Sequence, residues 1–151
     1  MDTVQDFEDL LALLEQFGVR YLIIGGLAFI FHAKPRYTKD MDLWIGADKD
    51  NVERVNQALA EFGSPELLDP QRGDEILQLG VAPNRIDLLR ETAGASFEEA
   101  WKRRVEGRYG PATVYWVDID TLIAIKSAID DPRHQEDARI LRAVRDREAR
   151  T

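Results

Sequence analysis

Hydrophobic and polar residues alternate along this chain with two different periods, which distinguish helices from strands. From residue 7 to residue 17 the hydrophobic positions follow the spacing of one helix face, and Gly18 stands where such a helix would end. Residues 19–24 form a short apolar run rich in β-branched side chains, which predicts a buried strand. In residues 39–45 polar and apolar side chains alternate, which predicts a second strand with a different character on each face.

The same two periods predict the remaining elements. Helices are expected over residues 26–33, 50–63, 96–105, 120–129 and 131–147, and strands over residues 74–80, 84–90 and 112–119. Two of these helices begin with the spacing of a capping box, which pairs Asp50 with Glu53 and Ser96 with Glu99. Helices and strands interleave without a repeat or a linker, so residues 1–151 are expected to form a single α/β domain.

Two aspartates, Asp40 and Asp42, lie inside the alternating strand of residues 39–45. Burial of an unpaired carboxylate costs several kcal/mol unless a cation or another partner offsets it. Because side chains two residues apart share a face, these two lie roughly 6–7 Å apart along the strand and can reach one divalent cation or a close pair. Asp87 alternates in the same way within residues 84–90 and is the natural third ligand for Mg²⁺.

Gly25 and Gly26 join the first strand to the helix that follows it. Glycines there allow a close approach of the backbone, and the start of a helix offers N–H donors to an anion. A phosphate at this turn and a cation held by the aspartates together describe phosphoryl or nucleotidyl transfer.

These motifs also carry a family resemblance. The segment IIGGLAFIFHAKPRYTKDMDLWI (residues 23–45) resembles the signature of the nucleotidyltransferase superfamily that shares the DNA polymerase β palm. Its part RYTKDMDL resembles the Arg-x-Thr-x-Asp-x-Asp-Leu form of bacterial minimal nucleotidyltransferases, the branch that includes abortive-infection toxins. The tail LIAIKSAIDDPRHQEDARIL is similar to the closing helices of that branch, although Glu136 stands where relatives usually have a lysine.

The resemblance implies a nucleotidyltransferase fold of the α/β (α+β) class, with a mixed, mainly antiparallel sheet flanked by helices. It implies transfer of a nucleoside monophosphate from a nucleoside triphosphate to a hydroxyl acceptor, with Mg²⁺ or Mn²⁺ as cofactor. The site residues are the catalytic metal ligands Asp40, Asp42 and Asp87, and the nucleotide contacts Gly25, Gly26, Arg36, Thr38 and Lys126.

Some of these roles have a structural alternative. Arg36 and Thr38 either orient the acidic pair or bind phosphate, or they are an ordinary loop arginine and a capping threonine. Lys126 lies among apolar residues, so it either meets nucleotide phosphates or extends its stem along a half-buried helix.

The acceptor also stays open: a tRNA end, a protein side chain and a small molecule such as an antibiotic all offer hydroxyl groups. The small size of the chain favours a toxin–antitoxin or stress-response role, with a possible protein partner. An alternative is a catalytically silent module of the same fold that binds a protein. A third and weaker alternative is a plain nucleic-acid-binding domain.

Composition limits the choice of partners and location. With 20 Lys and Arg residues against 28 Asp and Glu residues, the net charge of −8 argues against non-specific binding of nucleic acid. The basic clusters at residues 101–108 and at Arg139, Arg142 and Arg145 either contact RNA or are solvated helix faces. The absence of cysteine excludes disulfides and thiolate-ligated metals. An acidic start and the lack of a long apolar run predict a cytoplasmic protein without membrane contact.

Overall fold

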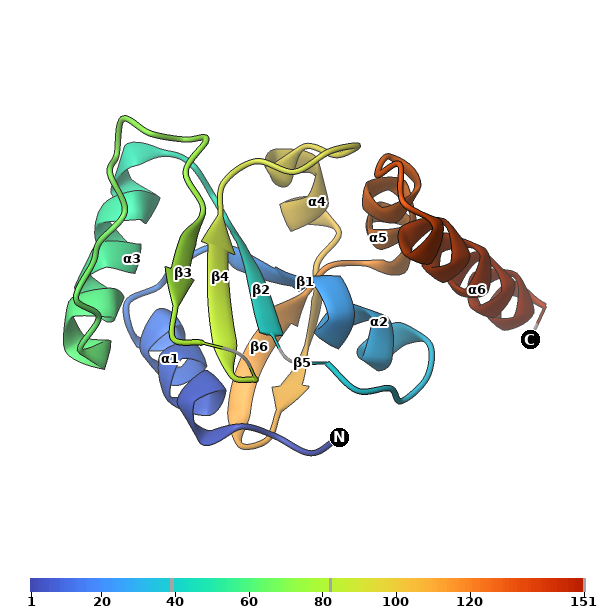
Figure 1. Cartoon of the computed structure of the whole chain (residues 1–151), viewed down its shortest axis with the longest axis horizontal. Helices are drawn as coiled ribbons and strands as arrows, with labels where there is room; N and C mark the ends of the chain where they lie inside the picture. Colours follow the sequence, from blue (N-terminus) through green and yellow to red (C-terminus); the bar gives the residue numbers. More distant parts are fainter. Residues whose placement is uncertain (39, 82, 151) are drawn as a thin grey trace.

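The computed structural model describes residues 1–38, 40–81 and 83–150 (Figure 1). In this part of the chain six strands form one sheet in the order β3-β4-β2-β1-β6-β5. The strands are β1 (Tyr21–Ile24), β2 (Asp40–Ile45), β3 (Leu77–Leu79), β4 (Arg85–Leu89), β5 (Val105–Tyr109) and β6 (Ala112–Trp116). The helices are α1 (Gln5–Gln16), α2 (Gly25–His32), α3 (Lys49–Phe62), α4 (Phe97–Lys102), α5 (Ile119–Ser127) and α6 (Pro132–Ala149).

The sheet contains both parallel and antiparallel pairs. Strands β1 and β2, β3 and β4, and β5 and β6 run antiparallel to each other. The pairs β2–β4 and β1–β6 are parallel. The prediction of a mixed, mainly antiparallel sheet is therefore confirmed.

Two groups of helices flank this sheet. Helix α1 packs on α3 and β6, whereas α2 packs on β1 and β2 and meets α5 and α6. In Figure 1 the pair α1 and α3 lies at the left of the sheet, and α5 and α6 lie at the right. The alternating residues of β2 explain its central place, because Met41, Leu43 and Ile45 are fully buried on one face.

Strand β5 was not expected, and the predicted helix over residues 96–105 is correspondingly too long. The chain leaves α4 at Lys102 and then forms a hairpin with β6 through a turn at Gly110, whose φ is 56°. Within β5, Gly107 interrupts the hydrophobic alternation. A Cβ at this position would lie 3.0 Å from Trp116 Nε1, so the packed indole ring favours a glycine there.

The predicted capping boxes are also corrected. Helix α3 begins at Lys49, and its cap is Asp48, whose carboxylate accepts a hydrogen bond from the Asn51 N–H. Asp50 therefore lies inside the first turn, where its negative charge interacts favourably with the helix dipole. Ser96 does precede α4, but its side chain makes no capping hydrogen bond. Helix α6 begins as predicted, with Asp131 as its cap and Pro132 in its first turn.

Among the described residues, none of the helices has the length and apolar character needed to cross a membrane.

Candidate active site

The two central strands bring the predicted carboxylates together. In the parallel register of β2 and β4, Asp42 lies opposite Asp87 and Asp40 lies opposite Arg85. Paired strands are only about 4.8 Å apart, so side chains at facing positions on one face are close neighbours. The aspartate pair of β2 and the aspartate of β4, which lie in separate segments of the sequence, are therefore neighbours in the fold.

Arg85 lies between two of these carboxylates. Its Nε and Nη2 donate to the two oxygens of Asp87 at 2.9 and 3.1 Å, and Nη2 also donates to Asp40 Oδ2 at 3.0 Å. Arg85 was not among the predicted site residues. Its position two residues before Asp87, and hence on the same face of the strand, was the available signal.

One arginine does not balance three carboxylates. Burial raises the pKa of Asp42 to about 6, and the negative charges of Asp87 and Asp40 act in the same direction. Among the described residues, Asp40 Oδ1 is a buried oxygen without a hydrogen-bond partner. The site thus has an excess of hard oxygen acceptors, the donor type that Mg²⁺ and Mn²⁺ prefer.

The described residues nevertheless contain no group of three or more acidic or histidine side chains already arranged around a cation position. The bonds of Arg85 to Asp40 and Asp87 agree with this, because they direct three carboxylate oxygens toward the guanidinium.

The glycine turn lies directly against Asp42. Gly25 has a φ of 67°, which side-chain-bearing residues rarely adopt. A Cβ added to Gly25 would lie 2.1 Å from Asp42 Oδ2, so only glycine fits beside this carboxylate. The antiparallel pairing of Ile24 with Asp42 fixes this approach. The predicted phosphate-binding turn and the predicted metal ligand are therefore adjacent.

Gly26 and Thr38 form a second close contact. A Cβ on Gly26 would lie 2.6 Å from Thr38 Oγ1. The same hydroxyl lies 3.5 Å from the backbone oxygen of Asp40, to which it donates a long hydrogen bond. Thr38 thus packs between the glycine turn and the start of β2, which suits a positioning residue.

Lys126 and Arg36 meet at a carboxylate that the sequence analysis did not select. Lys126 Nζ donates to Asp137 Oδ2 at 2.9 Å, and Arg36 donates to both Asp137 oxygens at 2.8 and 3.0 Å. Lys126 and Asp137 are only 4% and 6% exposed. Although burial acts to raise the pKa of Asp137, the hydrogen bonds from Arg36 and Lys126 keep it below its usual value.

A cavity of about 230 Å³ opens beside the carboxylates. Its polar lining comprises Asp42, Asp87, Thr92, Lys126 and His134, and Gly25 lies beside them. Its apolar wall comprises Ile24, Ile76, Leu89, Leu122, Ile125 and Ile129. Arg36 and Thr38 do not line this cavity but a second one of about 480 Å³, beside the N-terminal residues.

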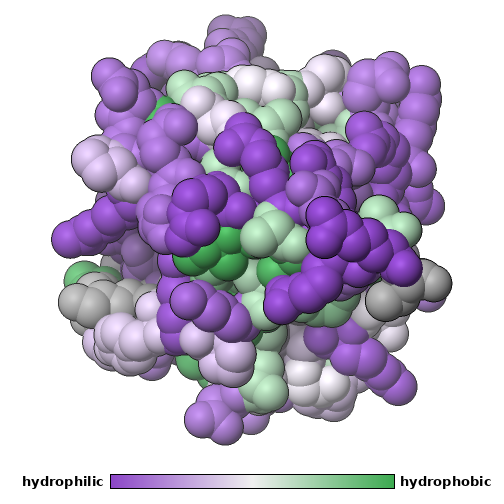
Figure 2. Space-filling view, turned by 90° about the vertical axis from the view of Figure 1, so that its right-hand side faces the viewer, coloured by the Kyte–Doolittle hydropathy of each residue, from purple (hydrophilic) through white to green (hydrophobic). Residues whose placement is uncertain are grey.

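The basic clusters are largely paired within the chain. Near α4, Arg103 pairs with Asp118 and Asp120, and the Arg104 guanidinium stacks on Trp101 at 4.1 Å. Along α6, Arg139 pairs with Glu136, Arg142 donates to Ser127, and Arg145 pairs with Asp120 and Asp146. The face at the α6 side of the molecule is largely hydrophilic (Figure 2). These contacts agree with solvated helix faces, and contact with RNA stays a prediction.

Solved structures provide the comparison with known proteins. The lincosamide antibiotic adenylyltransferase LnuA, in its lincomycin-bound form, matches 95% of this chain and 99% of its own, with a TM-score of 0.57 and 16% identity. This chain has the nucleotidyltransferase fold. An antigenic nucleotidyltransferase-like protein from Paracoccidioides brasiliensis matches 95% of this chain and 78% of its own, with a TM-score of 0.52 and 11% identity. No family model and no curated protein sequence matches this chain significantly.

The fold similarity confirms the predicted nucleotidyltransferase fold and its α/β architecture. Membership of the abortive-infection branch and the roles of the individual site residues stay predictions.

Proposed function

We propose that this chain is a metal-dependent nucleotidyltransferase that moves a nucleoside monophosphate from a nucleoside triphosphate to a hydroxyl acceptor. The observation that carries the proposal is the adjacency of Asp42, Asp87 and the Gly25 turn on neighbouring strands. In this proposal the carboxylates would hold a cation beside a helix start whose N–H groups would bind phosphate. The fold similarity to an adenylyltransferase is consistent with the proposal.

Asp40, Asp42 and Asp87 are the residues that would hold Mg²⁺ or Mn²⁺. They fit such an ion because Asp40 Oδ1 is buried without a partner among the described residues and because three carboxylates outnumber one arginine. When bound, a divalent cation neutralises phosphate charge and lowers the pKa of a coordinated hydroxyl.

The remaining residues bind and orient the triphosphate. Gly25 and Gly26 begin α2, so their N–H groups are available to the β- and γ-phosphates, and the missing side chain leaves room beside Asp42. The positive charge of Lys126 favours an anion in the cavity, and Asp137 holds its ammonium in place. Asp87 helps to activate the acceptor hydroxyl, as a base or as a metal ligand.

Arg36 and Thr38 act as positioning residues in this proposal. Arg36 connects the segment before β2 to α6 through Asp137, and its guanidinium stacks on Phe29 at 4.0 Å. Thr38 fixes the distance between the glycine turn and the start of β2. Both therefore support the carboxylates and the turn instead of contacting the reacting atoms.

The acceptor class is proposed from the neighbours and the sequence resemblance. Because LnuA is an antibiotic adenylyltransferase seen with lincomycin, a small hydroxylated molecule is the first acceptor to test. A tRNA end or a partner protein in a toxin–antitoxin or stress-response system is the second, as the resemblance to the bacterial minimal branch suggests. In either case we propose that the protein works in the cytoplasm.

Label transfer tests the proposal. Each of the four α-³²P nucleoside triphosphates is supplied with Mg²⁺ or Mn²⁺ to the wild type and to Asp42→Asn, with RNA, protein extract and hydroxylated antibiotics as separate acceptors. Asp48→Asn, which removes a carboxylate far from the site, is the matched control. Label that needs a metal, persists in Asp48→Asn and disappears in Asp42→Asn would support the enzyme and name its acceptor.

The silent module is the second candidate, and the Arg85 bonds to Asp40 and Asp87 favour it. A silent module need not bind a triphosphate. A folded wild type that transfers no label and binds no triphosphate with Mg²⁺ or Mn²⁺ would overturn the enzyme and leave this alternative.

A further inference from the structure

Arg85 uses the same oxygens that a divalent cation would need. Both oxygens of Asp87 accept from its guanidinium, at 2.9 and 3.1 Å, and Asp40 Oδ2 accepts at 3.0 Å. A planar guanidinium that bonds to both oxygens of one carboxylate makes a strong, well-oriented pair. A cation that coordinates Asp87 must therefore bind to an oxygen that already accepts from Arg85, where its charge repels the guanidinium.

Other oxygens at the site are not held by Arg85. Asp40 Oδ1 is buried and has no partner among the described residues. Asp42 lies opposite Asp87 in the strand register, and no bond to it from Arg85 is formed. The arginine thus bonds to two of the three carboxylates and leaves the third, Asp42, beside the glycine turn.

The Arg85 side chain can rotate away from Asp40 and Asp87 without disturbing the hydrophobic core. It is 32% exposed, and it belongs to the first residue of β4, at the edge of the site. The carboxylates themselves are held by the backbone register of β2 and β4, which does not depend on the guanidinium. Exchange of the arginine for another cation therefore needs only a side-chain rotation.

We infer that Arg85 is an internal counter-cation that closes the carboxylate site of the metal-free protein and must release Asp87 when a divalent cation binds. Arg85 thereby sets the metal concentration at which the site becomes occupied. This inference rests on the proposed function, because it assumes that Asp40, Asp42 and Asp87 bind a divalent cation.

Direct Mn²⁺ titration by electron paramagnetic resonance tests the inference without an activity assay. Arg85→Met should bind Mn²⁺ about five- to tenfold more tightly than the wild type, since the ion no longer displaces a charged hydrogen-bonded pair. Arg108→Met is the matched control, because it makes the same charge change in β5, at the far edge of the sheet. It should leave the Mn²⁺ affinity unchanged.

The outcomes separate the inference from the proposed function. If the wild type binds Mn²⁺, if Asp42→Asn abolishes this binding and if Arg85→Met binds equally or more weakly, the inference is overturned while the metal site stands. If only Arg85→Met binds, the arginine closes the site as inferred. If neither protein binds Mn²⁺, both the inference and the metal-dependent function are overturned.

A second measurement, made on the wild type, tests the inference even if Arg85→Met does not fold. In the wild type, the Nε–H signal of Arg85 is followed by ¹H–¹⁵N nuclear magnetic resonance and assigned with Arg85→Lys. Saturating Mg²⁺ should shift this signal toward that of a solvent-exposed arginine. A signal that stays in place while Mg²⁺ shifts the amides of β2 and β4 would contradict the release.

Discussion

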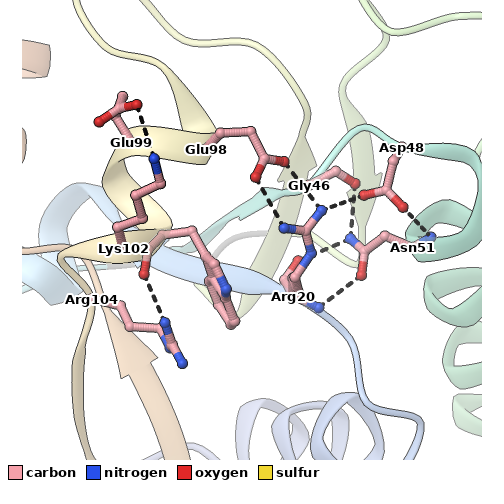
Figure 3. Close-up of polar contacts among 9 residues, drawn as sticks. Arg20, Gly46, Asp48, Asn51, Glu98, Glu99, Lys102 and Arg104 are labelled. Atoms are coloured by element: carbon pink, nitrogen blue, oxygen red, sulfur yellow. Dashed lines mark hydrogen bonds and ion pairs between the residues drawn. The ribbon is translucent and has the colours of Figure 1, made fainter.

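Two arginines of this chain lie between pairs of acidic side chains, at opposite ends of the central strands. Arg20, just before β1, binds Asp48 and Glu98, as Figure 3 shows. Arg85, at the start of β4, binds Asp40 and Asp87. The chemical groups are nearly the same in the two clusters, which we call the Arg20 cluster and the Arg85 cluster.

The difference is one additional buried carboxylate. In the Arg20 cluster every acid has a partner: although burial acts to raise the pKa of Asp48, hydrogen bonds from Arg20 and from the Asn51 N–H keep it below its usual value. In the Arg85 cluster, burial and two neighbouring carboxylates raise the pKa of Asp42 to about 6. A cluster in which each carboxylate is paired holds the fold together, whereas a cluster with an additional buried carboxylate has electrostatic free energy available for binding a cation.

The Arg20 cluster also makes many backbone contacts. The Asn51 side chain donates to the Arg20 and Gly46 carbonyls at 3.0 and 2.8 Å and accepts from the Arg20 N–H at 2.8 Å. These bonds join the start of β1 to the end of β2 and to α3, and Glu98 adds α4 (Figure 3). Its role is therefore structural.

The largest expected effect separates the two clusters by function. Asp42→Asn removes the central carboxylate and should lower nucleotidyl transfer at least about 100-fold, since charge stabilisation in the transition state is lost. Asp48→Asn should retain transfer within about twofold. Initial rates of label transfer give both values. Equal losses in the two variants would mean that the distinction between the clusters is wrong.

Next in size is the effect of a methyl group at the glycine turn. Gly25→Ala should lower transfer at least about 50-fold, because the new Cβ would overlap Asp42 Oδ2. Gly63→Ala is the control: its φ is also positive, at 89°, but no atom lies within 4 Å of the added Cβ. Both variants should lose roughly 1 kcal/mol of unfolding free energy from backbone strain, and Gly25→Ala should lose more because of the overlap with Asp42.

Urea unfolding and label transfer, measured on the same preparations, check this pair. Gly25→Ala activity close to that of Gly63→Ala would show that Asp42 does not need the open turn.

The third effect is a pH dependence of stability and is smaller than the two losses of activity. The titration of Asp42 should change the unfolding free energy by about 1–2 kcal/mol between roughly pH 4 and pH 7. Because the pKa of Asp42 is higher in the folded protein than in the unfolded chain, the folded state binds the additional proton. Its contribution to the unfolding free energy is therefore present at low pH and is lost as the pH rises through about 6.

Asp42→Asn removes this titration, so the metal-free variant should be more stable than the wild type at pH 7 and nearly equal to it at pH 4. Urea unfolding at several pH values in the presence of a chelator checks this difference. A wild-type stability advantage at pH 7 would contradict the account of Asp42 as an unbalanced carboxylate.

The smallest effect is expected for the Arg20 cluster. Arg20→Met should cost about 1 kcal/mol of unfolding free energy, since its ion pairs are partly exposed and its stacking over Phe97 and Trp101 is partly retained by the methionine. Its Mn²⁺ affinity should equal that of the wild type. Thermal unfolding and Mn²⁺ titration measure the two quantities. An altered Mn²⁺ affinity would show that the Arg20 cluster affects the carboxylate site, contrary to the proposed distinction.

Much of the fold follows from hydrophobic periodicity. Strand β2 has a clear alternation of polar and apolar residues, and helix α3 has a wide apolar stripe. Their secondary structure therefore depends little on tertiary contacts. Strand β5 was missed because Gly107 lacks a hydrophobic side chain, and the reason for this glycine is the packed ring of Trp116. That reason cannot be seen in the local sequence.

In the candidate site, too, the residues with a local sequence pattern could be predicted, and those that depend on tertiary contacts could not. Asp40, Asp42 and Asp87 could be chosen because carboxylates interrupt apolar strands, and their common position was a consequence of strand alternation. Arg85 was missed since an arginine at a strand start is ordinary by itself. Asp137 was missed because its partners Arg36 and Lys126 come from elements far apart in the sequence.

Crystals soaked in Mn²⁺ and a non-hydrolysable triphosphate would test the central claim most directly, by anomalous diffraction. The account predicts an anomalous peak within bonding distance of Asp42 and Asp87, with the Arg85 guanidinium displaced from Asp87. An absence of any peak at these carboxylates, with the triphosphate bound elsewhere or not at all, would contradict it.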